Sequence, residues 1–202
     1  MPAQKHFEII IVGSGIAGAS LAYFLTERGM TDILLLEREQ QPGYHSTGRS
    51  AAVLVEWDPI PALQELKALG GAFLRKPPSG FSERRLLEAS GILVVFQEPL
   101  WSAVRQVIPQ LQQHGTVAHL LSQAEVLARI PVLAPEHFDG GVVLPEDGHI
   151  DVHELLWGYL RSASRRGMQR LTGDEVTGVR IENRRCRGVE TTLGTFTAPW
   201  VV

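Results

Sequence analysis

The chain has a single cysteine, Cys186, and its 19 Lys and Arg residues form no basic block against 22 Asp and Glu residues. One thiol cannot form a disulfide within the chain or build a cysteine metal site, so a reducing compartment, the cytoplasm, is expected. A net charge of −3 without a basic face argues against nucleic acid as a partner. With 44% hydrophobic residues in 202, the chain is long enough and apolar enough for a folded core.

A long uninterrupted hydrophobic segment is also missing. The most apolar stretch, Phe7 to Leu25, contains Glu8 and three glycines, which does not suit a membrane helix. Its apolar residues change period within the stretch, from a continuous β-branched run at 9–12 to helical spacing from Ile16 onward. The segment therefore predicts a strand, a turn and a helix, and no integral membrane segment is expected.

The predicted turn reads GSGIAG, from Gly13 to Gly18, which is a GxGxxG pattern between a buried strand and a helix. Gly13 permits the tight turn, Gly15 lets a pyrophosphate approach the backbone, and Gly18 lets the helix pack closely on the strand. The N-terminus of the helix offers free N–H groups and a partial positive charge to the phosphates. The pattern predicts dinucleotide binding, against the alternative of a glycine-rich turn without a ligand.

A second strand, Asp32 to Glu37, ends in an acid nineteen residues after Gly18. A carboxylate at this position can accept hydrogen bonds from both hydroxyls of an adenosine ribose, and it would repel the additional phosphate of NADP. This unit consists of a strand, the GxGxxG turn, a helix, a second strand and a terminal acid. It leaves NAD and FAD as the alternatives for the bound dinucleotide.

The sequence after this strand, EREQQPGYHSTGRSAAV, resembles the corresponding segment of the FAD-dependent D-amino acid oxidase superfamily. The residue pattern of this segment is most similar to that of the bacterial D-arginine dehydrogenase-like D-amino acid dehydrogenases. The resemblance implies that the loop follows the FAD pyrophosphate to the flavin ring, and that Val176, at a strand end, meets the adenine. Arg49 would contact FAD or anchor nearby carbonyl groups. The candidate cofactor-binding residues are Gly13, Ser14, Gly15, Ile16, Ala17, Gly18, Glu37, Arg38, Ser46, Thr47, Gly48, Arg49, Ser50, Ala51, Ala52 and Val176.

The resemblance implies an α/β fold with a Rossmann-like FAD-binding domain of the GR2 type, interrupted by part of an α+β substrate domain. We expect residues 1–58 and 148–202 in the FAD-binding domain and 59–147 in the partial substrate domain. Helical patterns cover 61–74, 99–114 with a cap at Gly115, 122–130 and 151–166. Strands are expected at 86–96 with a break at Ser90-Gly91, in GGVVL, and at 169–171, 175–181, 187–192 and 195–198.

The resemblance further implies that the chain is the N-terminal half of a family member, because the family continues beyond Val202. The catalytic residues are therefore not assigned. His45 could be a base, although a hydrogen bond to backbone or flavin is the simpler role for a histidine in this loop. No metal site is expected, since a solvated role explains His149 and His153 more simply than ligation.

The expected function is oxidation of the C–N bond of an amino acid or related amine by hydride transfer to FAD, as in a D-amino acid dehydrogenase or oxidase. The electron acceptor is not indicated. Val53 and Ile92-Leu93 replace polar residues of arginine-type relatives, which favours a less basic or more apolar substrate. The alternatives are an FAD-dependent 2-hydroxy acid or glycerol-phosphate dehydrogenase, an NAD-dependent dehydrogenase, and a non-catalytic dinucleotide-binding product.

Overall fold

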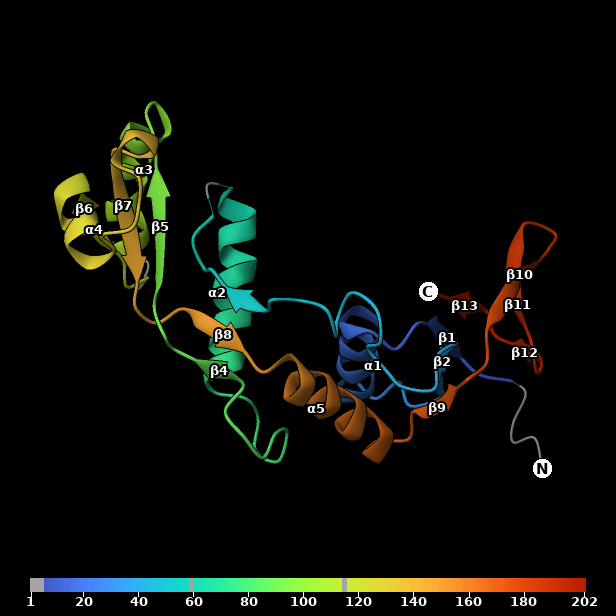
Figure 1. Cartoon of the computed structure of the whole chain (residues 1–202). Helices are drawn as coiled ribbons and strands as arrows, with labels where there is room; N and C mark the ends of the chain where they lie inside the picture. The colour runs from blue at the N-terminus through green and yellow to red at the C-terminus, as the bar shows by residue number, and fades with distance from the viewer. Residues whose placement is uncertain (1–5, 59, 114–115) are drawn as a thin grey trace. The chain divides into compact units, whose positions relative to one another are not determined.

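A computed structural model of the chain describes residues 6–58, 60–113 and 116–202, which fall into two compact units (Figure 1). Unit 1 contains Met1–Ser50, Ser79–Arg84 and Val152–Val202, and unit 2 contains Ala51–Pro78 and Arg85–Asp151. The chain therefore leaves unit 1 after the hydroxyl-rich loop, returns to it for Ser79–Arg84, and returns again from Val152 onward. The domain boundaries expected from the sequence stay a prediction.

Unit 1 is built around a four-stranded parallel sheet with the order β13-β1-β2-β9, and a three-stranded antiparallel sheet with the order β10-β11-β12. Two helices, α1 and α5, pack against each other, and α1 also contacts β1 and β2. Its elements are β1 (Ile9–Val12), α1 (Ile16–Glu27), β2 (Ile33–Glu37), α5 (Val152–Arg165), β9 (Gln169–Thr172), β10 (Val176–Glu182), β11 (Arg185–Thr191), β12 (Gly194–Thr197) and β13 (Trp200–Val201).

The central strands of the parallel sheet are covered on both faces. Ile10, Leu34 and Leu36 pack with Val189 in one buried cluster, so this face lies against the antiparallel sheet. On the other face Ile11 lies beside Gly18 at the start of α1. Because neither face meets water, β1 and β2 read as continuous apolar runs rather than alternating ones, as is typical of buried parallel strands.

Two glycines of the segment between β1 and α1 are required, one for its backbone conformation and the other for close packing. Gly13 has a φ of 100°, which a residue with a side chain rarely adopts. A Cβ atom on Gly18 would collide with the carbonyl oxygen of Gly13. At the other end of α1, Gly29 has a φ of 89° and its N–H donates to the Thr26 carbonyl, a geometry that ends the helix.

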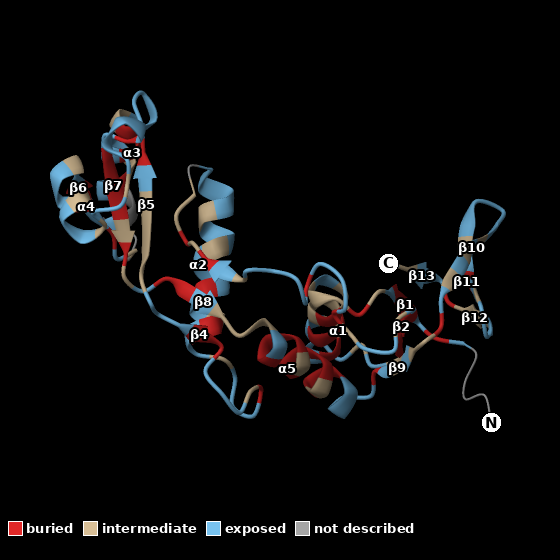
Figure 2. Cartoon of the chain, viewed as in Figure 1, coloured by how far each residue is buried: buried red, intermediate tan, exposed pale blue. Residues whose placement is uncertain are grey.

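An aromatic cluster fixes α5 against α1. The Tyr23 ring of α1 lies 5.3 Å from the ring of Tyr159 in α5 and 5.3 Å from the ring of Phe81, measured between ring centroids. The Phe81 ring lies 5.1 Å from that of Tyr159. A Cβ on Gly158 would enter the Phe81 ring, so this glycine permits the close approach. Figure 2 shows that most of α5 is buried.

The antiparallel sheet is organised by Asp174, which is 1% exposed. Its two carboxylate oxygens accept hydrogen bonds from the hydroxyls of Thr191 and Thr192 and from the Leu193 N–H, at 2.9 to 3.1 Å. Asp174 thereby holds the β11–β12 turn beside the segment that enters β10.

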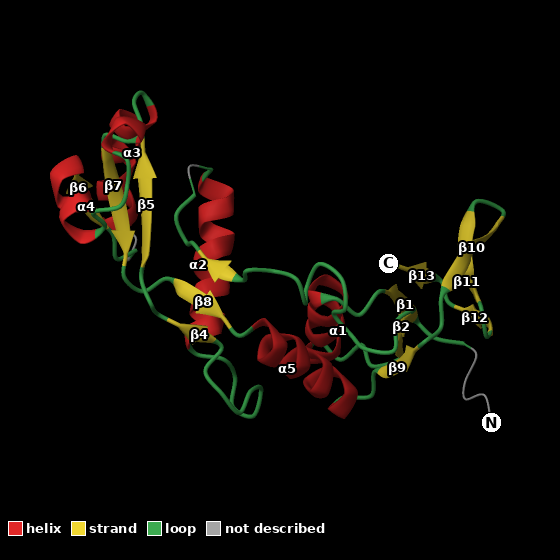
Figure 3. Ribbon diagram, in the orientation of Figure 1, coloured by secondary structure: helices red, strands yellow, loops and turns green. Residues whose placement is uncertain are grey.

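Unit 2 contains two three-stranded sheets, with the orders β3-β8-β4 and β5-β7-β6, and helices shown in Figure 3. Its main apolar cluster joins Trp101, Val104 and Ile108 of α3 to Phe96 and Val142. The elements are β3 (Val53–Leu54), α2 (Pro61–Arg75), β4 (Leu87–Glu88), β5 (Ile92–Phe96), α3 (Leu100–Gln113), β6 (His119–Ser122), α4 (Gln123–Arg129), the 3₁₀ helix η1 (Pro135–His137), β7 (Gly140–Leu144) and β8 (Gly148–Ile150).

A buried ion-pair cluster connects α2 to the β7–β8 turn within unit 2. Arg75 pairs with Glu56 at 2.7 Å and with Asp147 at 3.5 Å, and Asp147 accepts the Glu56 N–H at 2.9 Å. Burial raises the pKa of the Asp147 carboxyl above its usual value, although the Glu56 N–H and Arg75 oppose this. The cluster explains how two acidic side chains are accommodated at exposures of 8% and 2%.

Most predicted elements are present, with shifts at their ends. Ser122 and Glu125 form a capping box at the start of α4, within the predicted 122–130 helix, and Gly91 with a φ of 78° breaks the 86–96 segment as expected. The strands β3, β6, β8 and β13 were not predicted, because each is short and acquires its identity only by pairing with another strand. The predicted cap at Gly115 lies outside the described residues. No helix in the described part of the chain is both long and apolar enough to cross a membrane.

The Gly18 contact gives a stability prediction. We expect Gly18→Ala to destabilise the protein by about 1 to 3 kcal/mol or more, because the turn backbone at Gly13 must move to admit the methyl group. Urea denaturation followed by circular dichroism measures the change.

Gly178→Ala is the matched control, since a Cβ there would meet only Glu190, at an ordinary 3.8 Å. Equal denaturation midpoints for the two variants would contradict the close packing of α1 on β1.

Candidate dinucleotide-binding site

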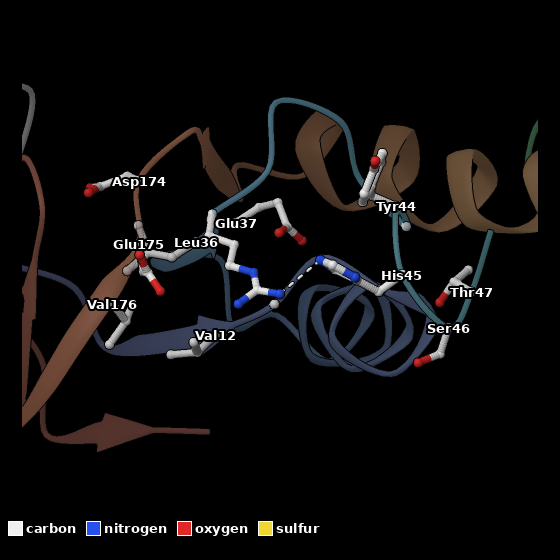
Figure 4. A pocket seen from close by; sticks show the side chains of 14 residues that line it. Val12, Leu36, Glu37, Tyr44, His45, Ser46, Thr47, Asp174, Glu175 and Val176 are labelled. Carbon is white, nitrogen blue, oxygen red and sulfur yellow. Dashed lines mark hydrogen bonds between the residues drawn. The ribbon is translucent and has the colours of Figure 1, made fainter. Parts of the chain in front are cut away.

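A cavity of ≈ 390 Å³ lies in unit 1 at the carboxyl ends of β1 and β2 (Figure 4). Ligands of open α/β sheets bind at this end of the strands, where the loops leave the sheet. Its walls come from the ends of β1 and β2, the loop after β2 and the segment that enters β10. The lining residues are Val12, Gly13, Gly15, Leu36, Glu37, Arg38, Gly43, Tyr44, His45, Ser46, Thr47, Asp174, Glu175 and Val176.

Backbone hydrogen bonds hold the segment that enters β10 against the end of β2, so that this segment forms one wall of the cavity. The N–H of Asp174 donates to the Glu37 carbonyl and the N–H of Gly173 donates to the Glu39 carbonyl, both at 3.0 Å. These bonds continue the parallel pairing of β2 with β9 past the strand ends. Val176 is thereby placed in the same cavity as Glu37, although the two lie far apart in the sequence.

Glu37 lies in the wall of the cavity, is 8% exposed and accepts three hydrogen bonds. Its Oε2 accepts the Ser14 N–H at 2.9 Å and the Ser14 hydroxyl at 2.8 Å, and its Oε1 accepts the Glu39 N–H at 3.0 Å. Burial raises the pKa of the Glu37 carboxyl, but the hydrogen bonds from Glu39 and Ser14 outweigh burial and hold the pKa below its usual value. Glu37 is therefore a carboxylate at neutral pH.

The N-terminus of α1 offers backbone donors next to the cavity. The Ile16 N–H donates to the Thr47 hydroxyl oxygen at 3.0 Å, so Thr47 from the loop caps this helix. Among the described residues, no acceptor is recorded for the N–H groups of Ala17 and Gly18. The first turn of α1 also has no acidic side chain, so its positive end is available to an anion.

Three charged or polar side chains meet at the mouth of the cavity. His45 Nε2 lies 2.9 Å from Arg38 Nη2 and 2.8 Å from Glu39 Oε1, and Arg38 Nε lies 3.3 Å from the same Glu39 oxygen. The dashed line in Figure 4 marks the contact between Arg38 and His45. His45 thus contacts side chains, whereas a backbone or flavin partner was expected from the sequence.

Arg49 stacks on an aromatic ring of its own loop. Its guanidinium carbon lies 5.5 Å from the centroid of the Tyr44 ring. This geometry is a cation–π contact, which neither of the two roles expected for Arg49 includes. Arg49 is exposed and does not line the cavity.

The residues present suit the adenosine and diphosphate parts of a dinucleotide. Glu37 can accept from ribose hydroxyls, the Ala17 and Gly18 N–H groups can donate to phosphate oxygens, and Val176 offers an apolar surface. Gly15 leaves room beside the Thr47 hydroxyl, since a Cβ at Gly15 would lie 3.1 Å from the Thr47 hydroxyl oxygen. The donor and acceptor set therefore matches the chemistry of such a group.

The structure gathers part of the predicted site around the cavity. The predicted residues that line it are Gly13, Gly15, Glu37, Arg38, Ser46, Thr47 and Val176. Ser14, Ile16, Ala17 and Gly18 form the turn behind them, and Gly48 packs on Gly43, whose carbonyl accepts its N–H at 2.7 Å. Ala51 and Ala52 belong to unit 2. The cofactor-binding roles of all the predicted residues stay predictions.

Several lining residues were not among the predicted ones. These are Val12, Leu36, Gly43, Tyr44, His45, Asp174 and Glu175. All except Asp174 either lie next to a predicted residue or belong to the loop motif, so adjacency was the one available signal. The buried role of Asp174 in the β11–β12 turn has no such signal.

The remaining histidines considered in the sequence lie elsewhere. His149 of unit 2 contacts the Ser90 hydroxyl at 3.1 Å, and the His153 ring of unit 1 lies 6.1 Å from that of Trp157. Within the described ranges, no group of three or more His, Cys, Asp or Glu side chains is arranged to hold a metal ion.

Comparison with known proteins identifies the family. Residues 8–202 match the family described as DAO, FAD dependent oxidoreductase. The chain belongs to this family. The predicted superfamily, the α/β fold class and FAD as the cofactor of the family are thereby confirmed, and FAD is preferred to NAD.

Relatives in the family cover nearly the whole chain. It is 29% identical over 200 residues to sarcosine oxidase subunit beta of Rhizobium meliloti, covering 95% of this chain and 47% of that protein. It is 27% identical to the mitochondrial sarcosine dehydrogenase of Homo sapiens, covering 100% of this chain and 22% of that protein. The chain thus spans about half, or less, of the length of these curated relatives.

Solved structures agree with this assignment. Glycine oxidase from Bacillus cereus superposes with a TM-score of 0.74 at 26% identity, covering 96% of this chain and 55% of that chain. The fold is also that of L-proline dehydrogenase from P. horikoshii, with a TM-score of 0.83 at 22% identity, covering 98% of this chain and 52% of that chain.

The lowered pKa of Glu37 predicts how stability depends on pH. An unfolded glutamate titrates near pH 4.3. Because the folded pKa is lower, the stabilisation is fully present above about pH 4.3 and is lost as the pH falls through the folded pKa. We expect Glu37→Gln to cost about 1.5 to 3 kcal/mol at pH 7, with a smaller difference from the unchanged protein at pH 3.

Urea denaturation midpoints at pH 7, 4.5 and 3 measure this dependence. Glu8→Gln, which removes a carboxylate at an exposed position, controls for the change in net charge. A difference that stays constant down to pH 3 would show that Glu37 is not held as a carboxylate in the folded protein.

Proposed function

We propose that the chain binds FAD and is part of an oxidoreductase that oxidises the C–N bond of an amino acid or related amine. Glu37 would accept from the adenosine ribose, and the Ala17 and Gly18 N–H groups and the loop from Ser46 to Ser50 would hold the diphosphate. Bound FAD supplies a two-electron acceptor for the hydride that leaves the carbon beside the amine. Catalytic residues are not part of the proposal.

The observation that carries the proposal is a carboxylate in the cavity with the N-terminus of α1 directly beside it. Glu37 is held ionised by Ser14 and Glu39, while the first turn of α1 has unpaired N–H groups and no acidic side chain. A ligand with hydroxyls at one end and phosphates next to them satisfies both groups. A ribose that carries an additional phosphate does not satisfy both groups, because the Glu37 carboxylate would repel that phosphate.

The names of the relatives support an amine substrate. They include sarcosine oxidase subunit beta, sarcosine dehydrogenase and dimethylglycine dehydrogenase, which name N-methylated amino acids. The finer prediction of a D-amino acid rests on the resemblance of the loop after β2. The names include both oxidases and dehydrogenases, so the electron acceptor is left open, and the cytoplasmic location stays a prediction.

A second candidate function is cofactor binding without catalysis. The chain is 26% identical, over its whole length, to a protein named pyruvate dehydrogenase phosphatase regulatory subunit of Mus musculus. A regulatory protein within the same set of relatives favours this candidate over the glycerol-phosphate and 2-hydroxy acid alternatives.

The first test is binding of FAD to the purified chain. We expect flavin absorbance to remain with the protein on gel filtration, and Gly15→Ala to weaken FAD binding about tenfold. The added Cβ lies 3.1 Å from the Thr47 hydroxyl oxygen and disturbs its hydrogen bond to Ile16.

Quenching of flavin fluorescence measures the affinity, and Gly178→Ala, away from the cavity, serves as the control. A folded chain that remains colourless and quenches no flavin fluorescence would overturn the proposal.

The second test is a substrate panel on the FAD-loaded chain. We expect sarcosine and small neutral amino acids to bleach the flavin at least about tenfold faster than D-arginine, because Val53 and Ile92-Leu93 offer no charge to a cationic side chain. Both enantiomers of each chiral amino acid are included, with oxygen and an artificial acceptor compared. Bound FAD that no member of the panel reduces would favour the second candidate function.

A further inference from the structure

One nitrogen atom of His45 lies in two contacts that it cannot make as hydrogen bonds at the same time (Figure 4). His45 Nε2 is 2.9 Å from Arg38 Nη2 and 2.8 Å from Glu39 Oε1. A guanidinium group only donates hydrogen bonds and a carboxylate only accepts them, while one imidazole nitrogen carries either a lone pair or a proton. Nε2 therefore accepts from Arg38 when it has no proton, and donates to Glu39 when it has one.

The charged groups around His45 favour opposite states of the ring. The Glu39 carboxylate attracts the imidazolium form, whereas the Arg38 guanidinium repels it. The Tyr44 ring lies 5.2 Å away with its edge toward His45, and Arg49 stacks on that ring. The charged residues that line the other walls of the cavity are all acidic, namely Glu37, Asp174 and Glu175. Histidine is the side-chain type that ordinarily changes charge between pH 5 and 8, in contrast to arginine, tyrosine and the carboxylic acids.

The charge at the mouth of the cavity depends on the state of His45. With the neutral ring, the charges of Arg38 and Glu39 cancel, and the guanidinium donates to the ring. With the imidazolium, the three side chains carry one net positive charge, and Arg38 has lost the ring as an acceptor. The Arg38 guanidinium can then donate to an anion in the cavity, which it also lines.

We propose that His45 is a proton-controlled switch at the mouth of the cavity, which turns from Arg38 to Glu39 on protonation and thereby strengthens binding of the ligand's diphosphate. This inference rests on the proposed function, because it concerns the same cavity, and it adds a regulation of binding by protons. Since the three side chains are 32% to 54% exposed, screening by water limits the effect to a severalfold change in affinity.

The test is isothermal titration calorimetry with ADP-ribose, whose diphosphate is esterified at both ends and keeps its charge between pH 5.5 and 8. For the unchanged chain we expect binding about threefold to tenfold tighter at pH 5.5 than at pH 8, because the mouth gains a positive charge. Titrations at pH 6.5 in two buffers with different heats of ionisation measure proton exchange directly. We expect a net uptake of protons when ADP-ribose binds.

His45→Gln should remove the dependence on protons. The Gln amide has separate donor and acceptor atoms, so it can contact Glu39 and Arg38 together without a change of charge. We expect the affinity of this variant to differ by less than about twofold between the two pH values, with no proton uptake. His6→Gln is the matched control, because His6 contacts the Thr197 hydroxyl at 2.9 Å and does not line the cavity, so this variant should keep the uptake.

The outcomes separate this inference from the proposed function. If neither ADP-ribose nor FAD binds at either pH, the proposed function fails and the inference fails with it. If ADP-ribose binds without proton uptake, or with an uptake that persists in His45→Gln, the inference alone is overturned. The two-buffer comparison needs no variant, so a His45→Gln protein that circular dichroism shows to be unfolded leaves the inference testable.

Discussion

The hydrogen bonds between Ser14 and Glu37 determine the shape of the site. They join the turn after β1 to the end of β2, the two strand ends from which the cavity opens. A buried carboxylate is costly unless donors surround it, and Ser14 and Glu39 supply them. Because these donors fix the Glu37 carboxylate at the end of β2, its negative charge lies near the positive end of α1, at the carboxyl ends of the strands. A ligand that carries phosphates and hydroxyls close together matches both.

Two layers support this arrangement from behind. The α1–α5 pair holds one face of the parallel sheet through the ring contacts of Tyr23, Phe81 and Tyr159. The antiparallel sheet covers the other face and, through Asp174, fixes the turn that leads into β10. Segments from both halves of the sequence therefore meet at the cavity, which explains why a chain interrupted by a whole second unit still forms a single site within unit 1.

Much of the dinucleotide unit was predictable because its signals are local. GxGxxG after a β-branched run, and an acid at the end of the next strand, specify strand, turn and helix through backbone geometry and burial alone. The short strands β6 and β13 were not predictable in this way, because four and two residues carry too little periodicity and depend on a partner strand. The pairing of His45 with Arg38 and Glu39, and the stacking of Arg49 on Tyr44, depend on how a turn-rich loop closes on itself.

The sequence by itself determined the dinucleotide fingerprint, the acid that follows it and the resemblance to FAD-dependent oxidoreductases. These features depend on residue type and spacing, which the chain carries wherever it folds. Only the tertiary structure decided which donors surround Glu37, which loop residue caps α1, and that Asp174 and Glu175 line the same cavity as Glu37. Those properties arise from contacts between distant segments, such as the hydrogen bond from the Asp174 N–H to the Glu37 carbonyl, which joins residues 137 apart. A sequence pattern confined to thirty residues contains no information about such distant neighbours.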